Sequence, residues 1–150
     1  MANTYTQIYI QIVFSTQSRQ NLIRREIKNE IYKYITGIVQ NKDHKLITIN
    51  GMPDHVHIFT GMKPNESISE LVRDIKKDSS NFINSKNWIR GKFTWQEGYG
   101  AFSYGHSQID DVYQYIQNQE NHHEKQTFKQ EYLGLLKKFN IKYDEQYVFD

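Results

Sequence analysis

The succession of strand-like and helix-like apolar patterns along the chain is the feature that most constrains this fold. Alternating apolar residues predict a strand, because successive strand side chains point to opposite faces, whereas a repeat every three or four residues predicts a helix. The predicted order is strand, helix, strand, strand, helix, strand, over residues 4–15, 27–41, 45–50, 55–59, 68–82 and 93–103. This is the order of the α+β ferredoxin-like (split βαβ) fold, an antiparallel sheet with two helices on one face. Its first and third strands lie at the centre of the sheet.

Two further helices are expected after this core, over residues 109–122 and 127–139, where apolar residues again recur at helical spacing. Ser107 is expected to cap the first of them. Ser67 and Glu70 have capping-box spacing, in which a hydroxyl and a carboxylate satisfy the first free N–H groups of a helix. The sequence therefore predicts the ferredoxin-like core with two appended C-terminal helices.

Length and composition favour a single domain over residues 1–150, which is long enough to bury a core without disulfides. The absence of cysteine excludes disulfide frameworks, cysteine-ligated zinc and thiol nucleophiles, and is typical of a reducing compartment. No apolar run is long enough to span a membrane, and residues 1–4 lack a signal-peptide pattern, so a cytoplasmic protein is expected. The net charge of +2 indicates no particular class of partner.

His55 and His57 lie two residues apart on the predicted strand that follows a turn at residues 51–54, so both side chains share one face. Pro53 and Asp54 are typical of such a turn. Neutral imidazole is the commonest protein metal ligand, so the pair is half of a candidate metal site. The alternative is two polar residues on the wetter face of a half-buried strand.

Tyr115 and Gln119 lie one above the other, at i and i+4, on the flank of the buried face of the helix predicted at residues 109–122. Tyr113 falls on the buried face itself, which favours Tyr115 as a nucleophile. With the histidine pair they supply two imidazole nitrogens, an amide oxygen and a hydroxyl, a set that suits Mg²⁺ or Mn²⁺ and attack on a phosphodiester. The alternative for Tyr115 is an aromatic residue at the boundary of an amphipathic helix.

The segments 52–57 and 115–119 together resemble the HUH single-tyrosine transposases of bacterial insertion sequences, the TnpA type, and their domesticated relatives. The resemblance extends through residues 95–103 to residues 120–123. It implies a ferredoxin-like fold, a homodimer, and a single-stranded DNA substrate with hairpin ends that is cut and rejoined through a 5′-phosphotyrosine with Mg²⁺ or Mn²⁺. By position it implies Tyr115 as the nucleophile. The metal ligands that it implies are His55, His57 and Gln119.

Five basic residues on the predicted helices are candidate DNA contacts: Arg24, Arg25, Arg73, Lys76 and Lys77. The last three, at i, i+3 and i+4, are expected on one exposed side, where an ordinary solvated face is the alternative. His122 and His123 lie at the end of the predicted helix that contains Tyr115. The sequence is compatible with contacts of these histidines to DNA or metal, and equally with exposed positions at a frayed helix end.

Three other classes share part of this pattern. Hydrolases of the metallo-lactamase type also contain His-x-His but usually add an aspartate two residues later, where this chain has Phe59. A non-catalytic ferredoxin-like domain binds single-stranded nucleic acid by stacking bases on strand aromatics and does not require a histidine pair. A domesticated nickase acting on chromosomal hairpin repeats uses the same chemistry as the transposase and is separated from it mainly by the neighbouring DNA.

Overall fold

Four strands form one antiparallel sheet in the order β2-β3-β1-β4, so the first and third strands are central as predicted. The computed structural model describes residues 3–150, and Met1 and Ala2, on which part of the signal-peptide expectation rests, lie outside them. The elements are β1 (Tyr9–Ser15), α1 (Arg25–Asn41), β2 (Lys45–Met52), β3 (His55–Gly61), α2 (Ile68–Ser85), β4 (Gly100–Tyr104), α3 (Ile109–Gln117), α4 (Gln119–His123) and α5 (Phe128–Lys138). Short 3₁₀ turns occupy Gln17–Arg19 and His106–Gln108.

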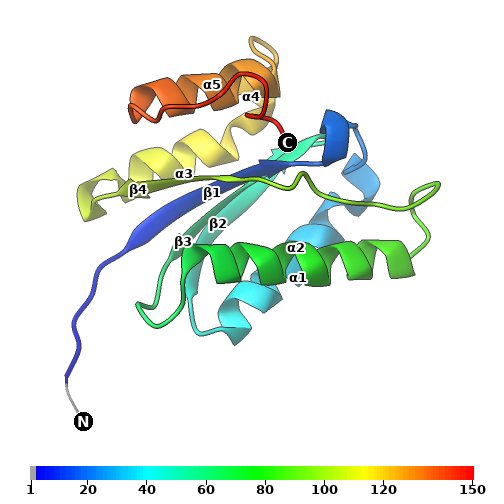
Figure 1. Ribbon diagram of the computed structural model, residues 1–150. Coiled ribbons are helices and arrows are strands. Elements are labelled where there is room, and N and C mark those ends of the chain that lie inside the picture. Colours follow the sequence, from blue (N-terminus) through cyan, green and yellow to red (C-terminus); the bar gives the residue numbers. More distant parts are fainter. Residues whose placement is uncertain (1–2) are drawn as a thin grey trace.

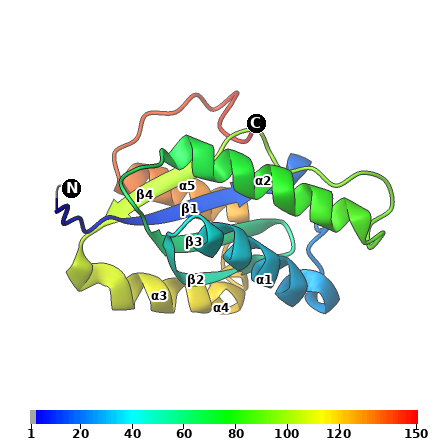
Figure 2. The ribbon, with the colours of Figure 1, turned by 90° about the horizontal axis from the view of Figure 1, so that it is seen from below.

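Helices cover both faces of the sheet (Figures 1 and 2). The α1 and α2 helices pack on the face formed by residues such as Ile12, Phe14 and Ile58, which confirms the ferredoxin-like arrangement. On the opposite face α3 packs against Phe59, and α5 packs against Val13. Because strand side chains alternate, His55 and His57 share this second face with Phe59. The histidine pair therefore points into the layer built by the C-terminal helices.

Two strand predictions need correction. The first strand begins at Tyr9 rather than at residue 4. The predicted fourth strand, residues 93–103, is regular only from Gly100 to Tyr104. Before Gly100 one hydrogen bond still joins the chain to β1, because Gln96 N–H donates to the Ser15 carbonyl at 2.9 Å. Gly98 N–H, in contrast, donates to the Asp150 carbonyl at 2.7 Å. At Gly98 the chain therefore pairs with Asp150 and not with β1.

The predicted helix over residues 109–122 is divided into α3 and α4 at Asn118. The Asn50 side chain on β2 donates to the carbonyls of Ile116 at 3.0 Å and Gln117 at 3.2 Å, and so satisfies groups that a continuing helix would use. Ser107 is not a helix cap, because a 3₁₀ turn precedes α3. The Ser67 cap is confirmed, since its hydroxyl accepts from Glu70 N–H at 3.1 Å.

Within residues 3–150, every helix is too short or too polar to cross a lipid bilayer.

Candidate metal and nucleophile site

The β2–β3 hairpin places the histidine pair at the start of a central strand. Gly51 lies so close to the following turn that a Cβ there would be 2.2 Å from the His55 carbonyl oxygen, so only glycine fits. The turn is tied to its surroundings by Thr16 N–H, which donates to the Asp54 carbonyl at 2.9 Å. Both imidazoles are fully buried. Their rigid setting suits precise placement of ligand atoms.

Oxygen acceptors orient both imidazole rings. His55 Nδ1 lies 2.7 Å from Asp54 Oδ1, and His57 Nδ1 lies 2.7 Å from Gln11 Oε1. The Gln11 amide is itself held by donation from Nε2 to the Tyr104 hydroxyl at 2.9 Å, so its oxygen faces the ring. Each Nδ1 therefore carries a proton, and each Nε2 turns toward α5. Metal-binding histidines in proteins show this arrangement of outer partners.

Glu131, on α5, was not identified from the sequence, yet it is at the centre of the site. Its Oε1 lies 3.0 Å from His57 Nε2, 3.1 Å from His123 Nε2 and 3.3 Å from His55 Nε2. The side chain is buried. It interrupts the apolar stripe that Phe128, Tyr132 and Leu135 form on α5. A carboxylate within an otherwise apolar stripe was the available clue, since buried carboxylates need partners.

Gln119 on α4 and Tyr115 on α3 contact the same carboxylate. Gln119 is buried, its Oε1 lies 3.0 Å from His55 Nε2, and its Nε2 donates to Glu131 Oε2 at 3.1 Å. The Tyr115 hydroxyl also donates to Glu131 Oε2. The structure thus brings together all four residues singled out by the sequence, His55, His57, Tyr115 and Gln119, and adds Glu131 between them.

Burial and the shared carboxylate set the protonation of the site. Burial alone would lower the pKa of His55, but hydrogen bonds to Asp54 and Glu131 outweigh it and raise that pKa to about 9. Burial lowers the pKa of His57. Burial would raise the pKa of Glu131, but bonds to His123, His55 and His57 hold it well below its usual range.

The nucleophile candidate is protonated in this environment. Burial, followed by the negative charge of Glu131, raises the pKa of the Tyr115 hydroxyl above its ordinary value. A phenol of this kind attacks efficiently only if its proton leaves during the attack. Glu131 Oε2 already accepts the hydrogen bond of this hydroxyl and is therefore a candidate acceptor for that proton.

The donor set fits a divalent metal. His55, His57 and Glu131 each offer one ligand atom, and these atoms all lie within 4.8 Å of one another. Two imidazole nitrogens and a carboxylate thus lie close together in a buried setting, where a cation between them would bind the unprotonated forms of these groups. Gln119 Oε1 lies beside His55 Nε2 and is a further oxygen donor.

The other histidines and the rival tyrosine differ in position. Tyr113 is 39% exposed, so its predicted place on the buried face is wrong, because α3 turns Val112 and Ile116 toward the sheet. His123 contacts Glu131 and belongs to the site. The His122 ring lies against the Tyr115 ring, with 4.6 Å between centroids.

The basic candidates for DNA contact occupy two separate regions. Arg24 and Arg25 begin α1 near the site, where Arg25 pairs with Glu120 of α4 at 3.2 Å. Arg73, Lys76 and Lys77 lie on α2, which covers the opposite face of the sheet. Lys76 is half-buried rather than exposed as expected. The role of these residues in DNA binding stays a prediction.

Two cavities flank the buried site. The larger, about 870 Å³, is lined by residues that include Arg24, Asp54 and His123. The smaller, about 430 Å³, is lined in part by Tyr115 and Glu131. Both fall in the range of small-ligand sites, ~300–1,000 Å³. The smaller cavity therefore opens onto the carboxylate and the phenol, and the larger one reaches the site at His123.

Comparison with known proteins identifies the family. The family model described as "Transposase IS200 like" matches residues 4–119. The chain belongs to the IS200-like transposase family. One relative of this transposase is the ISDra2 transposase TnpA of Deinococcus radiodurans, which is 21% identical over 118 residues, or 75% of this chain and 84% of the relative. Glu131 and α5 lie beyond the segment that the family model matches.

Solved structures share the fold of this IS200-like transposase. A crystal structure of a Deinococcus radiodurans protein described as a transposase has a TM-score of 0.64 and 21% identity, and the match covers 79% of this chain and 95% of that one. A REP-associated tyrosine transposase bound to a REP hairpin has a TM-score of 0.56 and 12% identity, and the match covers 79% of this chain and 68% of that one. These similarities confirm the ferredoxin-like fold.

Proposed function

We propose that this transposase cuts and rejoins single-stranded DNA beside hairpins through a covalent bond between Tyr115 and a 5′-phosphate. The observation that carries the proposal is the meeting of the Tyr115 hydroxyl with the Glu131 carboxylate that also bonds His57. A nucleophile, a proton acceptor and a metal-ligand set thus share one point. The structural relative bound to a REP hairpin supports hairpin-bearing DNA as the partner.

In this proposal His55 and His57 hold a divalent cation through Nε2, and Glu131 Oε1 or Gln119 Oε1 supplies the oxygen donor. A mixed nitrogen and oxygen set suits Mn²⁺ or Mg²⁺. When bound, the metal polarises a phosphate oxygen and offsets the charge that develops on it. Asp54 and Gln11 keep the two rings in the tautomer that binds metal.

The covalent step exchanges one phosphoester for another. A bond forms between the Tyr115 oxygen and phosphorus, and the bond from phosphorus to the 3′ oxygen of the preceding nucleotide breaks. Its electron pair stays on that oxygen, which takes a proton from solvent and becomes a 3′-hydroxyl. The phenol proton passes to Glu131 Oε2, which already accepts its hydrogen bond, as the new bond to phosphorus forms, because the low pKa of Glu131 prevents it from deprotonating the phenol beforehand. Rejoining runs the same transfers in reverse with an incoming 3′-hydroxyl.

One chain supplies both the tyrosine and the histidine pair, which supports action within a single subunit. Tyr115 and His57 lie with ring centroids 6.1 Å apart, so no rearrangement of α3 is needed to bring them together. The homodimer implied by the family resemblance stays a prediction.

The test is the covalent adduct. A hairpin-containing single strand labelled at its 3′ end is incubated with protein and Mn²⁺ and then separated under denaturing conditions, so that only DNA attached to protein shifts. The wild type and the control Tyr113→Phe should form the adduct, and Tyr115→Phe should form none while binding DNA equally well. An adduct with Tyr115→Phe, or none with the wild type, contradicts the proposal.

A further inference from the structure

We infer that the cavity between α3 and α5 holds a single nucleobase of the DNA strand, the base next to the phosphate that Tyr115 attacks. The inference rests on the proposed function, because it assigns a subsite to that substrate. The cavity of about 430 Å³ is built by one side of each helix. Gln108, Asp111 and Tyr115 follow one another at intervals of three and four residues along α3 and the turn before it, and Glu131, Gly134 and Lys138 do so along α5.

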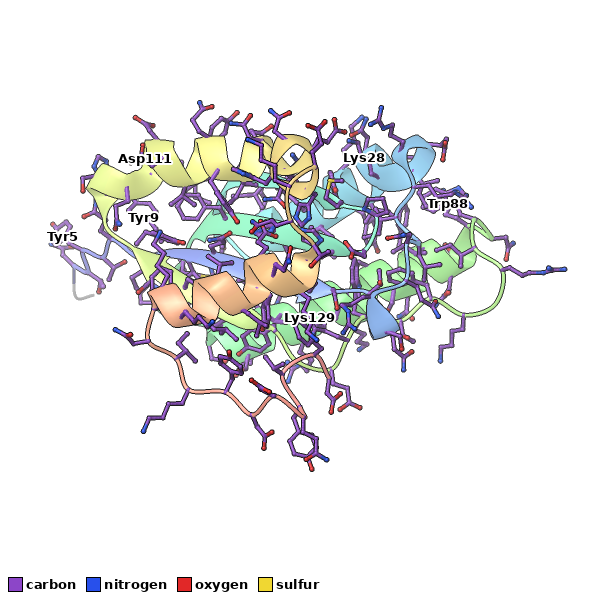
Figure 3. The ribbon with its side chains drawn as sticks, turned by 90° about the horizontal axis from the view of Figure 1, so that it is seen from above. Tyr5, Tyr9, Lys28, Trp88, Asp111 and Lys129 are labelled. Atoms are coloured by element: carbon purple, nitrogen blue, oxygen red, sulfur yellow. The ribbon has the colours of Figure 1, made fainter. Side chains whose placement is uncertain are left out.

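The position of the cavity supports this occupant. Attack requires the phosphorus atom to come within about 3–3.5 Å of the Tyr115 oxygen. The two nucleosides bonded to that phosphate must therefore lie close to the Tyr115 ring. The cavity is the space directly beside Tyr115 and Glu131. Figure 3 shows the two walls from above, with Asp111 on α3 and Lys129 marking α5. A base that unstacks from its neighbours beside the attacked phosphate can therefore occupy the smaller cavity.

The chemistry of the lining also suits a base. Val112 and Leu135 are apolar, and Tyr104 adds an aromatic ring, which together match the flat faces of a base. Gln126 and Gln130 offer amide donors and acceptors for the base edges. Single-stranded nucleic acids are commonly recognised by this combination of stacking and edge hydrogen bonds.

The two cavities are neighbours. Gln126 and Gln130 line both the smaller cavity and the larger one of about 870 Å³. The larger cavity carries Arg24 and Lys125, which suit the phosphates of an approaching strand. In this inference the strand crosses Gln126 and Gln130, with its phosphates along the larger cavity and its next base in the smaller one.

Gly134 keeps the smaller cavity open. It lies in the interior of α5, where glycine costs about 1 kcal/mol relative to alanine. A Cβ at this position would meet no atom within 4 Å, so packing does not require glycine. Gly37 of α1 is equally open but lies against the other face of the sheet. What distinguishes Gly134 is that a side chain there would enter the space beside the nucleophile.

The test compares Gly134→Leu with the matched control Gly37→Leu. Both substitutions replace an open helix glycine, so both should fold and melt at or above the temperature of the wild type. The probe is a pool of single strands in which a fixed hairpin is flanked by randomised sequence. Sequencing the covalent adducts formed with Mn²⁺ locates the cleaved phosphate and any preference at the adjacent bases. Strands with an abasic residue at each adjacent position are then compared with intact strands.

One abasic position should lower the rate of adduct formation by the wild type about tenfold, which corresponds to the usual contribution of one stacked base. Gly134→Leu should form the adduct about tenfold more slowly on the intact strand and at the same rate on intact and abasic strands. The rate for Gly134→Ala on the intact strand should lie between those of the wild type and Gly134→Leu. Gly37→Leu should behave as the wild type. A Gly134→Leu protein that keeps the rate and base preference of the wild type, or equal losses in both leucine variants, contradicts the pocket. No adduct from the wild type contradicts the proposed function instead.

Discussion

The Tyr115 hydroxyl donates its hydrogen bond to Glu131, a carboxylate sixteen residues later in the chain that also faces His57. The bond joins α3 to α5 across the face of the sheet on which the histidine pair lies. One oxygen of Glu131 faces the imidazoles, and the other faces the phenol and the Gln119 amide. The carboxylate therefore links the proposed metal ligands to the proposed nucleophile, and its substitution should affect both.

Replacing Glu131 by glutamine should slow adduct formation about 100-fold at saturating DNA and Mn²⁺. The amide keeps the shape of the side chain but cannot take the phenol proton, and loss of such a group typically costs at least about 10²-fold. Single-turnover adduct formation measures the rate. Glu120→Gln, at an exposed acidic residue of the neighbouring helix, is the control and should match the wild type. A Glu131→Gln rate within threefold of the wild type would rule out this role for the carboxylate.

Removing an outer partner of the histidines should weaken metal binding without removing a ligand. Asp54→Ala and Gln11→Ala should each lower Mn²⁺ affinity by about 10–100-fold, the usual effect of losing a group that orients a metal-binding imidazole. Titration calorimetry gives the affinity. Asp54→Asn retains an acceptor oxygen for His55 Nδ1 and should recover most of the loss. Equal affinities in the alanine and asparagine variants would show that the contact with His55 is irrelevant to metal binding.

A divalent metal should stabilise the folded protein, because the ligand atoms converge only when β3 and α5 are in place. At a free Mn²⁺ concentration of 100 times the dissociation constant, the free energy of unfolding should rise by about 2.7 kcal/mol. Chemical unfolding with and without Mn²⁺ measures the difference. His57→Ala removes one ligand atom and should lose most of the increment. The same increment in His57→Ala would place the metal elsewhere.

The sequence predicted the sheet and the first half of the site because both depend on local spacing. Alternation put His55 and His57 on one strand face, as the structure confirms. Helical periodicity put Tyr115 and Gln119 on one side of a single helix; the helix is divided at Asn118, but both side chains still donate to Glu131. Glu131 could not be assigned in this way. Its partners are 74 and 16 residues distant, and its contacts depend on how α5 packs over the sheet, which no local pattern encodes.

Two of the errors have a related physical origin. Tyr113 was placed on the buried face by counting 100° per residue along a uniform helix. The true phase of α3 depends on its packing against Phe59 and on its end at Asn118, where Asn50 takes the last carbonyls. The predicted fourth strand is regular only from Gly100, and just before it Gly98 N–H donates to the carbonyl of the distant Asp150. In both cases a distant segment contacts the element, and local spacing does not encode that contact.

Lys76 should prove to be a structural residue rather than a DNA contact. Its ammonium group donates to the carbonyls of Gln96 at 2.8 Å, Glu97 at 3.0 Å and Gly98 at 2.7 Å, so all three of its donors are used. Lys76→Met keeps most of the apolar stem and leaves these carbonyls without a partner, which should lower the free energy of unfolding by about 1–3 kcal/mol.

Lys77 provides the matched control, because it is the next residue on α2 and is exposed. Lys77→Met should change the free energy of unfolding by less than about 0.5 kcal/mol. Urea unfolding measures both variants, and DNA binding at several salt concentrations separates the two roles. If Lys77 contacts a phosphate, its loss should reduce the slope of log affinity against log salt by about 1, whereas Lys76→Met should leave that slope unchanged. A reduced slope with unaltered stability in Lys76→Met would return this residue to the DNA-binding surface.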